Sequence, residues 1–245
     1  MTDTVLSAKK ITHCYEKDVI IEDVSVELHK EEIVSLLGVS GVGKTTLFQI
    51  LSGLVKPTSG TVYLEGEEIT GKAGHISYML QKDLLMPYHT MEDNVAMPLL
   101  IQGMKKAEAR KKASSYFAEF GIEGTQRNYP SQLSGGMRQR AALLRTYLFG
   151  KEVALLDEPF SALDAITKSE MHRWYLEVMH RIRLSTIFVT HDIDEAIFLS
   201  DRILVMAGHP GHIVKELTLP KEKDNDFLLS SKSLEMKREI LSVLQ

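Results

Sequence analysis

Residues 31–54 read EEIVSLLGVSGVGKTTLFQILSGL. The short apolar run IVSLLG is typical of a buried strand, and TTLFQILSGL carries its apolar residues at helical spacing. Between them, GVSGVGKT (residues 38–45) matches the phosphate-binding pattern G-x-x-x-x-G-K-[ST], which requires a strand before it and a helix after it. Composition alone would produce such a match in a chain of this length about once in a hundred. The stretch therefore predicts a P-loop nucleotide-binding fold.

The residues of this loop have different expected roles. Glycines let backbone N–H groups surround a phosphate without a Cβ in the way, and the following helix adds partial positive charge at its N-terminus. Lys44 is expected to reach the β- and γ-phosphates, and the Thr45 hydroxyl to bind Mg²⁺. The nucleotide-binding set expected from this loop is Gly38, Ser40, Gly41, Gly43, Lys44, Thr45 and Thr46.

A second half of the metal site is predicted much later in the chain. The segment VALLDEPF (residues 153–160) is an apolar strand that ends at Asp157 and is followed directly by Glu158. A carboxylate at the C-terminal end of a strand beside the P-loop strand is placed to hold Mg²⁺ through water. Glu158 is placed to orient or deprotonate the water that attacks the γ-phosphate.

The chain divides into regions of different pattern. The first third reads as strands and turns, whereas residues 83–148 favour helix, including the segment KKAEARKKASSYFAEFG. Strands and helices alternate after that, which predicts a mainly parallel sheet covered on both faces. One of these helices carries an apolar stripe that we interpret as core, formed by Met171, Trp174, Tyr175, Val178, Met179 and Ile182. A terminal helix is predicted to be amphipathic, with Leu234, Leu241 and Leu244 along one side.

The segment LSGGMRQR (residues 133–140) raises a separate question. A serine and two glycines that lead into a helix leave backbone N–H groups open to an anion. A better phosphate site already lies at residues 38–45, so this segment predicts a second anion site in the same chain.

Composition limits the class of protein. The 245 residues are 44% hydrophobic and 25% charged, which is typical of a globular protein. A net charge of −4 argues against nucleic acid as the main partner, because binding to phosphate backbones depends on an excess of Lys and Arg. The single cysteine, Cys14, excludes an internal disulfide and indicates a reducing compartment. We find no secretory signal pattern and no apolar run of about 20 residues, so we expect a cytoplasmic protein, or one that rests on a membrane only through another component.

Taken together, these motifs resemble those of the ABC-type ATP-binding subunits, and the resemblance covers essentially the whole chain. The P-loop at residues 38–46 is followed by Gln81 in YMLQKD, by the signature LSGGMRQR, by LLDEP with SALD, and by TIFVTHD with His191. Tyr15 occupies the place of the family's aromatic ring that stacks on adenine. Each residue alone has a structural interpretation, but their joint order and spacing favour the family.

The resemblance implies a fold and an organisation. It predicts an α/β P-loop NTPase with a RecA-like, mainly parallel sheet, an antiparallel β subdomain and an inserted α-helical subdomain, all within a single ATP-binding domain. The expected divisions are residues 1–82 and 147–217 for the α/β core with its β subdomain, 83–146 for the helical subdomain and 218–245 for a C-terminal tail helix.

The resemblance also implies how the second anion site works. In this family two chains pack head to tail, and each ATP lies between the P-loop of one chain and the signature of the other. The segment formed by Ser134, Gly135 and Gly136 would then hold the γ-phosphate of the partner's ATP. Asp164 is implied to contact the opposite chain.

The expected catalytic set is Glu158, His191 and Gln81. The first two would organise the attacking water, and Gln81 would sense the nucleotide and the metal, whose ligands would be Thr45, Gln81 and Asp157. The implied cofactors are ATP and Mg²⁺. A two-fold dimer is the natural closed arrangement, because each surface is then used twice.

Two classes of function remain open for such an ATP-hydrolysing dimer. The first is a subunit peripheral to the cytoplasmic face of the cell membrane, driving a permease; the second is a soluble ABC ATPase that acts on DNA, ribosomes or iron–sulfur assembly. The single cassette, the slightly acidic charge and the absence of zinc-type cysteine pairs favour transport. The resemblance implies a permease-binding groove after Gln81, for which Leu85, Met86 and Tyr88 are candidates. These three could equally be core residues of the helical region.

Within transporters, YPSQLSGGMRQRAALLR resembles the nitrate/sulfonate/taurine importer group, whose relatives also include importers of thiamine-precursor pyrimidines. The chain departs from the group at Met86 and Tyr88, at LPKEKD in the tail, and at Gly150–Lys151. These departures leave nucleotide binding unaffected but leave the solute open. The resemblance also implies an external substrate-binding protein that acts through the permease.

Overall fold

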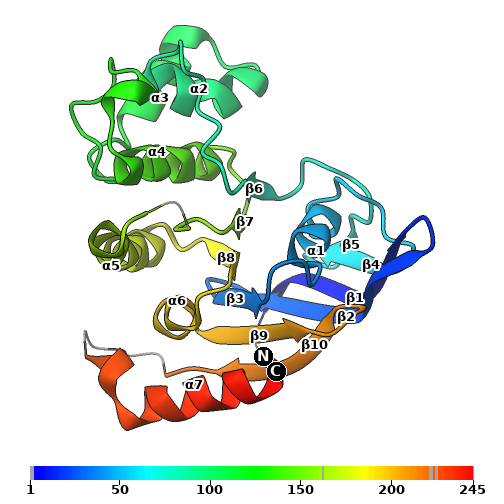
Figure 1. Ribbon diagram of the computed structural model, residues 1–245. Helices are drawn as coiled ribbons and strands as arrows, with labels where there is room; N and C mark the ends of the chain where they lie inside the picture. Colours follow the sequence, from blue (N-terminus) through cyan, green and yellow to red (C-terminus); the bar gives the residue numbers. More distant parts are fainter. Residues whose placement is uncertain (1–2, 162, 221–222, 224–225, 245) are drawn as a thin grey trace.

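The computed structural model describes residues 3–161, 163–220, 223 and 226–244 (Figure 1). The strands are β1 (Thr4–Tyr15), β2 (Asp18–His29), β3 (Ile33–Gly38), β4 (Ser59–Leu64), β5 (Glu67–Glu68), β6 (Ser77–Met79), β7 (Val153–Asp157), β8 (Ser185–Thr190), β9 (Arg202–Ala207) and β10 (His212–Thr218). The helices are α1 (Lys44–Leu51), α2 (Met91–Ile101), α3 (Lys106–Ser114), α4 (Gly135–Tyr147), α5 (Ala165–Ile182), α6 (Ile193–Leu199) and α7 (Ser231–Leu244), with 3₁₀ turns at Pro130–Gln132 and Phe227–Leu229.

The larger sheet has the order β10-β9-β3-β8-β7-β6, and all neighbours are parallel except the antiparallel edge pair β10–β9. Strands β3, β7 and β8 are buried along their whole length, as expected of parallel strands covered on both faces. The P-loop strand β3 is central, and its neighbours β8 and β9 flank it on either side. This topology confirms the predicted α/β P-loop fold.

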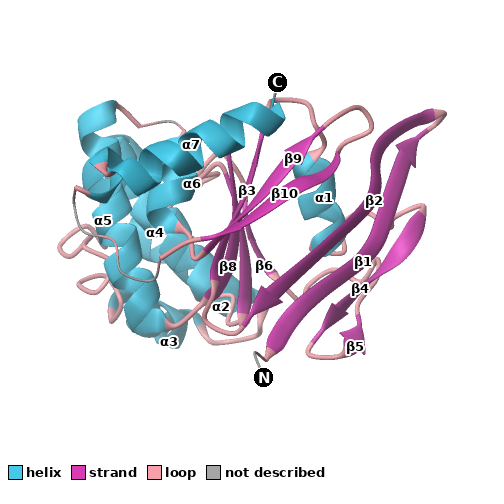
Figure 2. Cartoon of the chain, turned by 90° about the horizontal axis from the view of Figure 1, so that it is seen from below, coloured by secondary structure: helices cyan, strands magenta, loops and turns pink. Residues whose placement is uncertain are grey.

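The smaller sheet is antiparallel, with the order β2-β1-β4-β5. Its long hairpin β1–β2 lies on the same side of the larger sheet as α1, while α5, α6 and α7 lie on the other (Figure 2). The apolar side chains of β1, β2 and α1 share one hydrophobic cluster with β3. The hairpin therefore packs against the element that carries the P-loop.

The helices α2, α3 and α4 gather at one end of the molecule (Figure 1). The helix expected to continue to Gly121 ends at Ser114, and residues 115–120 form turns instead. The Ser115 hydroxyl donates to Lys112 O over 2.7 Å, an example of how serine side chains compete for backbone groups of a helix. The turns still bury Phe117 and Phe120 completely.

The apolar stripe of α5 is core, as predicted, with Trp174 and Ile182 only half buried.

The tail prediction is partly wrong. Helix α7 buries Ile240 and packs Leu244 against the sheet side, but Leu234 and Leu241 are about half exposed. These two leucines are seven residues apart on one face, and that face points away from the core because Ile240 lies about 100° round the helix from Leu241. The predicted tail range 218–245 also includes residues 221–222, 224–225 and 245, which lie outside the described residues. No helix in the described ranges combines the length and hydropathy needed to cross a membrane.

Candidate nucleotide site

The P-loop leaves the C-terminal end of β3 and enters α1 through Gly43, whose φ of 105° lies in the left-handed region. A Cβ on Gly43 would lie 2.4 Å from Ile21 Cγ2, and a Cβ on Gly38 would lie 2.5 Å from the Met206 carbonyl oxygen. Glycine is therefore required at both ends of the loop, at Gly38 by the lack of space and at Gly43 by backbone conformation as well.

Lys44 lies under this loop and is only 6% exposed. Its Nζ donates to the carbonyl oxygens of Gly38 and Val39, both over 2.8 Å. Burial lowers the pKa of Lys44, while the nearby carboxylates of Glu158 and Asp157 act in the opposite direction. A buried ammonium facing two carboxylates provides a fixed charge for phosphate oxygens.

A cavity of about 470 Å³ opens above the loop. Its walls come from the P-loop, β2 and the ends of β6, β7 and β8, and consist of Ile20, Ser40, Gly41, Gly43, Lys44, Thr45, Thr46, Gln81, Glu158 and His191. Four separate motifs of the sequence thus meet at one cavity: the P-loop and the segments that carry Gln81, Glu158 and His191. Ile20 was missed from the sequence, because an apolar residue in a strand gives no sign of facing a nucleotide.

Asp157 ends β7 as a buried carboxylate, next to the strand β8 that pairs with β3. Burial raises its pKa, although Tyr78 Oη donates to Asp157 Oδ2 over 3.3 Å and acts in the opposite direction. The described residues contain no cluster of three metal-ligating His, Cys, Asp or Glu side chains. The donors present, a hydroxyl at Thr45 and a carboxylate at Asp157, suit Mg²⁺ held jointly with phosphate oxygens and water.

The three predicted catalytic residues form one hydrogen-bonded group. Gln81 Nε2 donates to Glu158 Oε2 over 3.0 Å, and His191 Nδ1 lies 3.3 Å from Glu158 Oε1. The φ of Glu158 is 44°, a left-handed conformation rare for a side-chain-bearing residue, and its N–H donates to Val189 O. The backbone therefore turns this carboxylate toward its two partners at the cavity.

The segment predicted to form a second anion site lies elsewhere. Ser134 caps α4 by accepting from Met137 N over 3.3 Å, and the helix begins at Gly135. A Cβ on Gly136 would lie 3.3 Å from Thr167 Cγ2, so α4 packs closely against α5 at this point. None of the residues 134–136 lines the P-loop cavity of the same chain.

Two further predicted residues are placed away from the cavity. Tyr15 is about half exposed at the end of β1, with its ring edge-on to that of His13 at 4.7 Å between centroids. Asp164 caps α5 by accepting from the N–H of Thr167 over 3.1 Å and from its hydroxyl over 2.6 Å. These bonds lower the pKa of Asp164 and leave the carboxylate at the surface.

The segment after Gln81 differs from its prediction at one of three residues. Leu85 is 8% exposed and belongs to the core, so its assignment to a surface groove is wrong. Met86 does line an open, mainly apolar cavity of about 430 Å³, and Tyr88 is 91% exposed. The other apolar walls of this cavity are Leu54, Ile76, Leu84, Met97, Pro98, Ile101 and Phe149.

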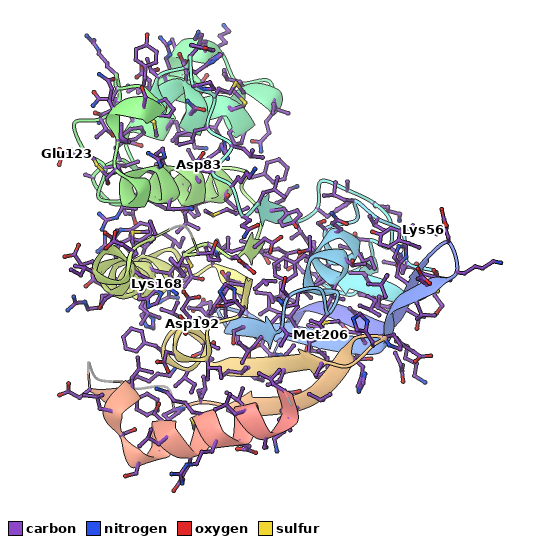
Figure 3. All side chains as sticks on the ribbon, in the orientation of Figure 1. Lys56, Asp83, Glu123, Lys168, Asp192 and Met206 are labelled. Atoms are coloured by element: carbon purple, nitrogen blue, oxygen red, sulfur yellow. The ribbon has the colours of Figure 1, made fainter. Side chains whose placement is uncertain are left out.

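The same segment is tied to the signature helix α4 by contacts that sequence reasoning did not find. Asp83 Oδ2 accepts from Arg138 Nε over 3.1 Å, and Arg145 donates to the carbonyl oxygens of Leu84 (3.0 Å) and Asp83. Figure 3 shows Asp83 beside α4. Both arginines lie on α4, so the segment that follows Gln81 is bonded directly to that helix.

A P-loop on the central strand, a buried carboxylate beside it and a glutamate at the cavity define an ATP-hydrolysing P-loop protein. Comparison with known proteins then gives the family: the model of the ABC transporter family matches residues 21–161. The chain belongs to the ABC transporter family, in which it is an ATPase that uses ATP with Mg²⁺.

Individual relatives agree with this assignment. The formylaminopyrimidine import ATP-binding protein ThiZ of Halalkalibacterium halodurans is 41% identical over 91% of this chain and 87% of its own length. The nitrate import ATP-binding protein NrtD of Synechocystis sp. is 36% identical over 85% of this chain and 78% of its own length. A solved dimeric post-hydrolysis state of the ATP-binding cassette MJ0796, bound to ADP and Pi, is similar in structure with a TM-score of 0.75, 28% identity and coverage of 89% of this chain and 100% of that one.

Proposed function

We propose that this chain is the ATP-hydrolysing subunit of a membrane importer for a small solute, and that it works as a head-to-tail dimer. The observation that carries the proposal is the group of Gln81, Glu158 and His191 at the cavity above the P-loop. A carboxylate held between an amide and an imidazole, beside a phosphate-binding loop, can organise a water for attack on a γ-phosphate.

Each residue of the site takes a defined part in this proposal. Backbone N–H groups of the P-loop and the ammonium of Lys44 bind the phosphates. Thr45 and Asp157 would hold Mg²⁺, which would supply charge neutralisation at the phosphate oxygens. Glu158 holds the attacking water, with His191 and Gln81 fixing its carboxylate.

The second part of the proposal is that a second copy completes the site. The N-terminus of α4 at Ser134 offers backbone N–H groups to an anion. This helix end does not line the chain's own nucleotide cavity. A head-to-tail dimer brings it to the γ-phosphate bound by the other copy, and each surface is then used twice. The solved MJ0796 cassettes are described as dimeric, which supports this arrangement.

The third part concerns the transport partner. Relatives at 36–41% identity are named for the import of formylaminopyrimidine, nitrate and aliphatic sulfonates, so the proposed solute belongs to this range of small polar molecules. We infer that a permease helix binds the apolar cavity lined by Leu54, Met86 and Ile101, with Tyr88 exposed nearby. In this proposal the chain lies on the cytoplasmic face of the membrane, and an external solute-binding protein acts through the permease.

The test uses a tagged Glu158→Gln chain expressed in its native cells and trapped with MgATP. We expect the variant to keep MgATP binding and lose turnover, because the amide cannot serve as a base, and to copurify with a multi-spanning permease at two ATP-binding chains per assembly. Fast turnover by this variant would contradict the role of Glu158. Recovery of ribosomes or DNA-repair proteins instead of a permease would support the alternative of a soluble ABC ATPase.

The dimer has its own test, which mixes chains carrying Ser134→Arg with chains carrying Lys44→Ala. Each variant alone should be inactive, whereas the mixture should form one intact composite site per heterodimer and recover part of the activity. No recovery in a mixture that still forms dimers would contradict the shared site.

A further inference from the structure

A buried group of charged side chains lies directly beneath the turn that carries His191. Lys168 projects from the first turns of α5 toward the start of α6, where its Nζ donates to Asp192 Oδ2 over 2.8 Å and also contacts Glu195 Oε1. Figure 3 shows Lys168 and Asp192 facing one another between these two helices. Glu195 is only 3% exposed, whereas the side chains of Lys168 and Asp192 are 22% and 36% exposed, so the group reaches from the interior to the surface.

The same glutamate holds the turn itself. Thr190 Oγ1 donates to Glu195 Oε2 over 2.6 Å and accepts from Asp192 N over 3.0 Å. Thr190 and Asp192 are the residues on either side of His191. The backbone that carries the imidazole is therefore fixed on both sides by contacts that lead to one buried carboxylate.

The cluster is charged at neutral pH despite its burial. Burial alone would raise the pKa of Glu195, but hydrogen bonds from His172, Lys168 and Thr190 outweigh this effect and leave the pKa below its usual value. Burial likewise would lower the pKa of Lys168, but its bonds to Asp192 and Glu195 outweigh it and raise the pKa. Such pairs add little net stability compared with apolar residues of the same size.

We propose that Lys168 and Glu195 are positioning residues for catalysis, which hold the turn at residues 190–192 so that His191 stays against Glu158. The inference rests on the proposed roles of His191 and Glu158. Neither positioning residue lines the nucleotide cavity, so both act through the imidazole rather than on the nucleotide.

The cluster also joins His191 to the expected dimer contact. Lys168 N donates to Asp164 O over 2.8 Å, which places Lys168 one helical turn after the residue that caps α5 at the surface. A second copy that engages Asp164 would thus press on the helix that fixes the turn of His191. The expected dimer contact at Asp164 and the positioning residue Lys168 are therefore one helical turn apart on α5.

The test measures steady-state ATP hydrolysis by Lys168→Met, Glu195→Gln and the double variant. The double variant removes the Lys168–Glu195 charge pair together, so the fully buried carboxylate is not left unpaired. Asp192 also loses Lys168, but its side chain is 36% exposed and keeps the backbone N–H groups of Asp194 and Glu195 as partners. We expect kcat per ATP-binding-competent molecule to fall about tenfold or more, since a displacement of about 1 Å can cost about 100-fold. The KM for MgATP and the measured MgATP affinity should stay within about twofold, because the P-loop contacts are untouched.

His191→Ala, alone and combined with Lys168→Met, distinguishes the positioning role of Lys168 from the catalytic role of His191. If Lys168 acts through His191, the combined variant is no slower than His191→Ala alone. Additive losses, or a normal kcat in the double variant that removes both charges, overturn the positioning role while leaving His191 catalytic. A normal kcat in His191→Ala would instead contradict the proposed function on which the inference rests.

Lys237→Met is the matched control. It removes the ion pair between Lys237 of α7 and Asp194, which lies on α6 but outside the cluster. We expect kcat to stay unchanged in this variant. An equal loss of kcat would mean that any disturbance of α6 slows hydrolysis, and the specific role of Lys168 would be refuted.

Discussion

At the scale of single residues, the site depends on backbone conformations that cannot be predicted from the residue types alone. Glu158 has a φ of 44° without being glycine, and such strain persists only where surrounding contacts over-determine it. Here the contacts are the backbone bond to Val189 and the side-chain bonds to Gln81 and His191. The strained turn points the glutamate carboxylate at the cavity rather than along the strand.

Gly43 provides a residue-scale prediction for the P-loop. Gly43→Ala adds a methyl group 2.4 Å from Ile21 Cγ2 at a φ of 105°, so the loop must shift and its N–H groups leave their positions around the phosphate. We expect MgATP affinity, measured by calorimetry, to fall about tenfold or more, which corresponds to about 1.4 kcal/mol.

Gly66→Ala is the control for Gly43→Ala. Gly66 has a φ of 84° in the turn between β4 and β5, where an added Cβ meets nothing within 4 Å. Both variants carry the backbone strain of a left-handed alanine, about 1–2 kcal/mol. Only Gly43→Ala should lose nucleotide affinity, and equal losses in both would show that strain, not P-loop geometry, controls binding.

At the scale of elements, charged side chains join neighbouring elements in addition to their apolar contacts. Arg110 of α3 bonds Asp93 of α2 through two contacts of 2.7 and 2.6 Å. Asp93 lies in the first turn of α2, where the helix dipole also favours a negative charge. The hydrogen bonds from Arg110 lower the pKa of Asp93 and keep it charged.

We expect Arg110→Met to lower the melting temperature by about 2–4 °C, because it leaves a shielded carboxylate without its bidentate partner. Differential scanning calorimetry measures the change. Lys106→Met is the comparison, since Lys106 is largely exposed and lies 3.8 Å from the same carboxylate. Its effect should be near zero, and equal effects would argue that geometry at Asp93 is unimportant.

Lys223 connects the tail to the end of α6 and gives a pH dependence. Its Nζ donates to the carbonyl oxygens of Phe198 (3.3 Å) and Ser200, and burial lowers the pKa of Lys223 to about 8. The unfolded chain holds this proton up to a pKa of 10.5, so the unfolded state binds more protons between pH 8 and 10.5. Burying the charged amine therefore costs stability at neutral pH, and this cost disappears as the pH rises through that window.

Urea unfolding of the wild type and of Lys223→Met at pH 7.5 and pH 10 tests this sign. The free energy of unfolding of the wild type should increase relative to the variant, by on the order of 3 kcal/mol across the whole window. A difference between the two proteins that does not change with pH would show that Lys223 titrates as an exposed lysine.

At the scale of the whole molecule, the two proposed recognition surfaces lie apart from the residues that line the nucleotide cavity: the capped N-terminus of α4 and the apolar cavity beside α2. Exposed leucine and isoleucine side chains are common singly, but Leu54, Leu84 and Ile101 share one cavity. A shared apolar cavity of this kind is typical of a binding groove.

Ile101→Glu should prevent copurification of the permease while leaving basal ATP hydrolysis unchanged, because Ile101 is 76% exposed and remote from the P-loop cavity. Leu234→Glu is the matched control, since Leu234 is an exposed leucine on α7 outside this groove. Membrane recovery and ATPase rate are measured on the same preparations. Retention of the permease by Ile101→Glu would contradict the proposed groove.

The sequence by itself determined the fold class and singled out the P-loop residues, Asp157, Glu158 and His191 as candidates for the site. It could do so because phosphate and magnesium chemistry demands particular residues at particular spacings, and buried parallel strands leave apolar runs in the sequence. The same local patterns predicted the core stripe of α5, because helical periodicity reports which face is buried.

Only the tertiary structure decided which side chains meet. It buried Leu85, exposed Leu234, and brought Lys168 and Glu195 together from two helices, although nothing in their spacing links them. A contact between charged residues on different helices cannot be predicted from a single sequence, because it depends on how the helices pack. Phosphate- and metal-binding motifs can be predicted from the order of residues, whereas burial and long-range pairing depend on how the chain packs.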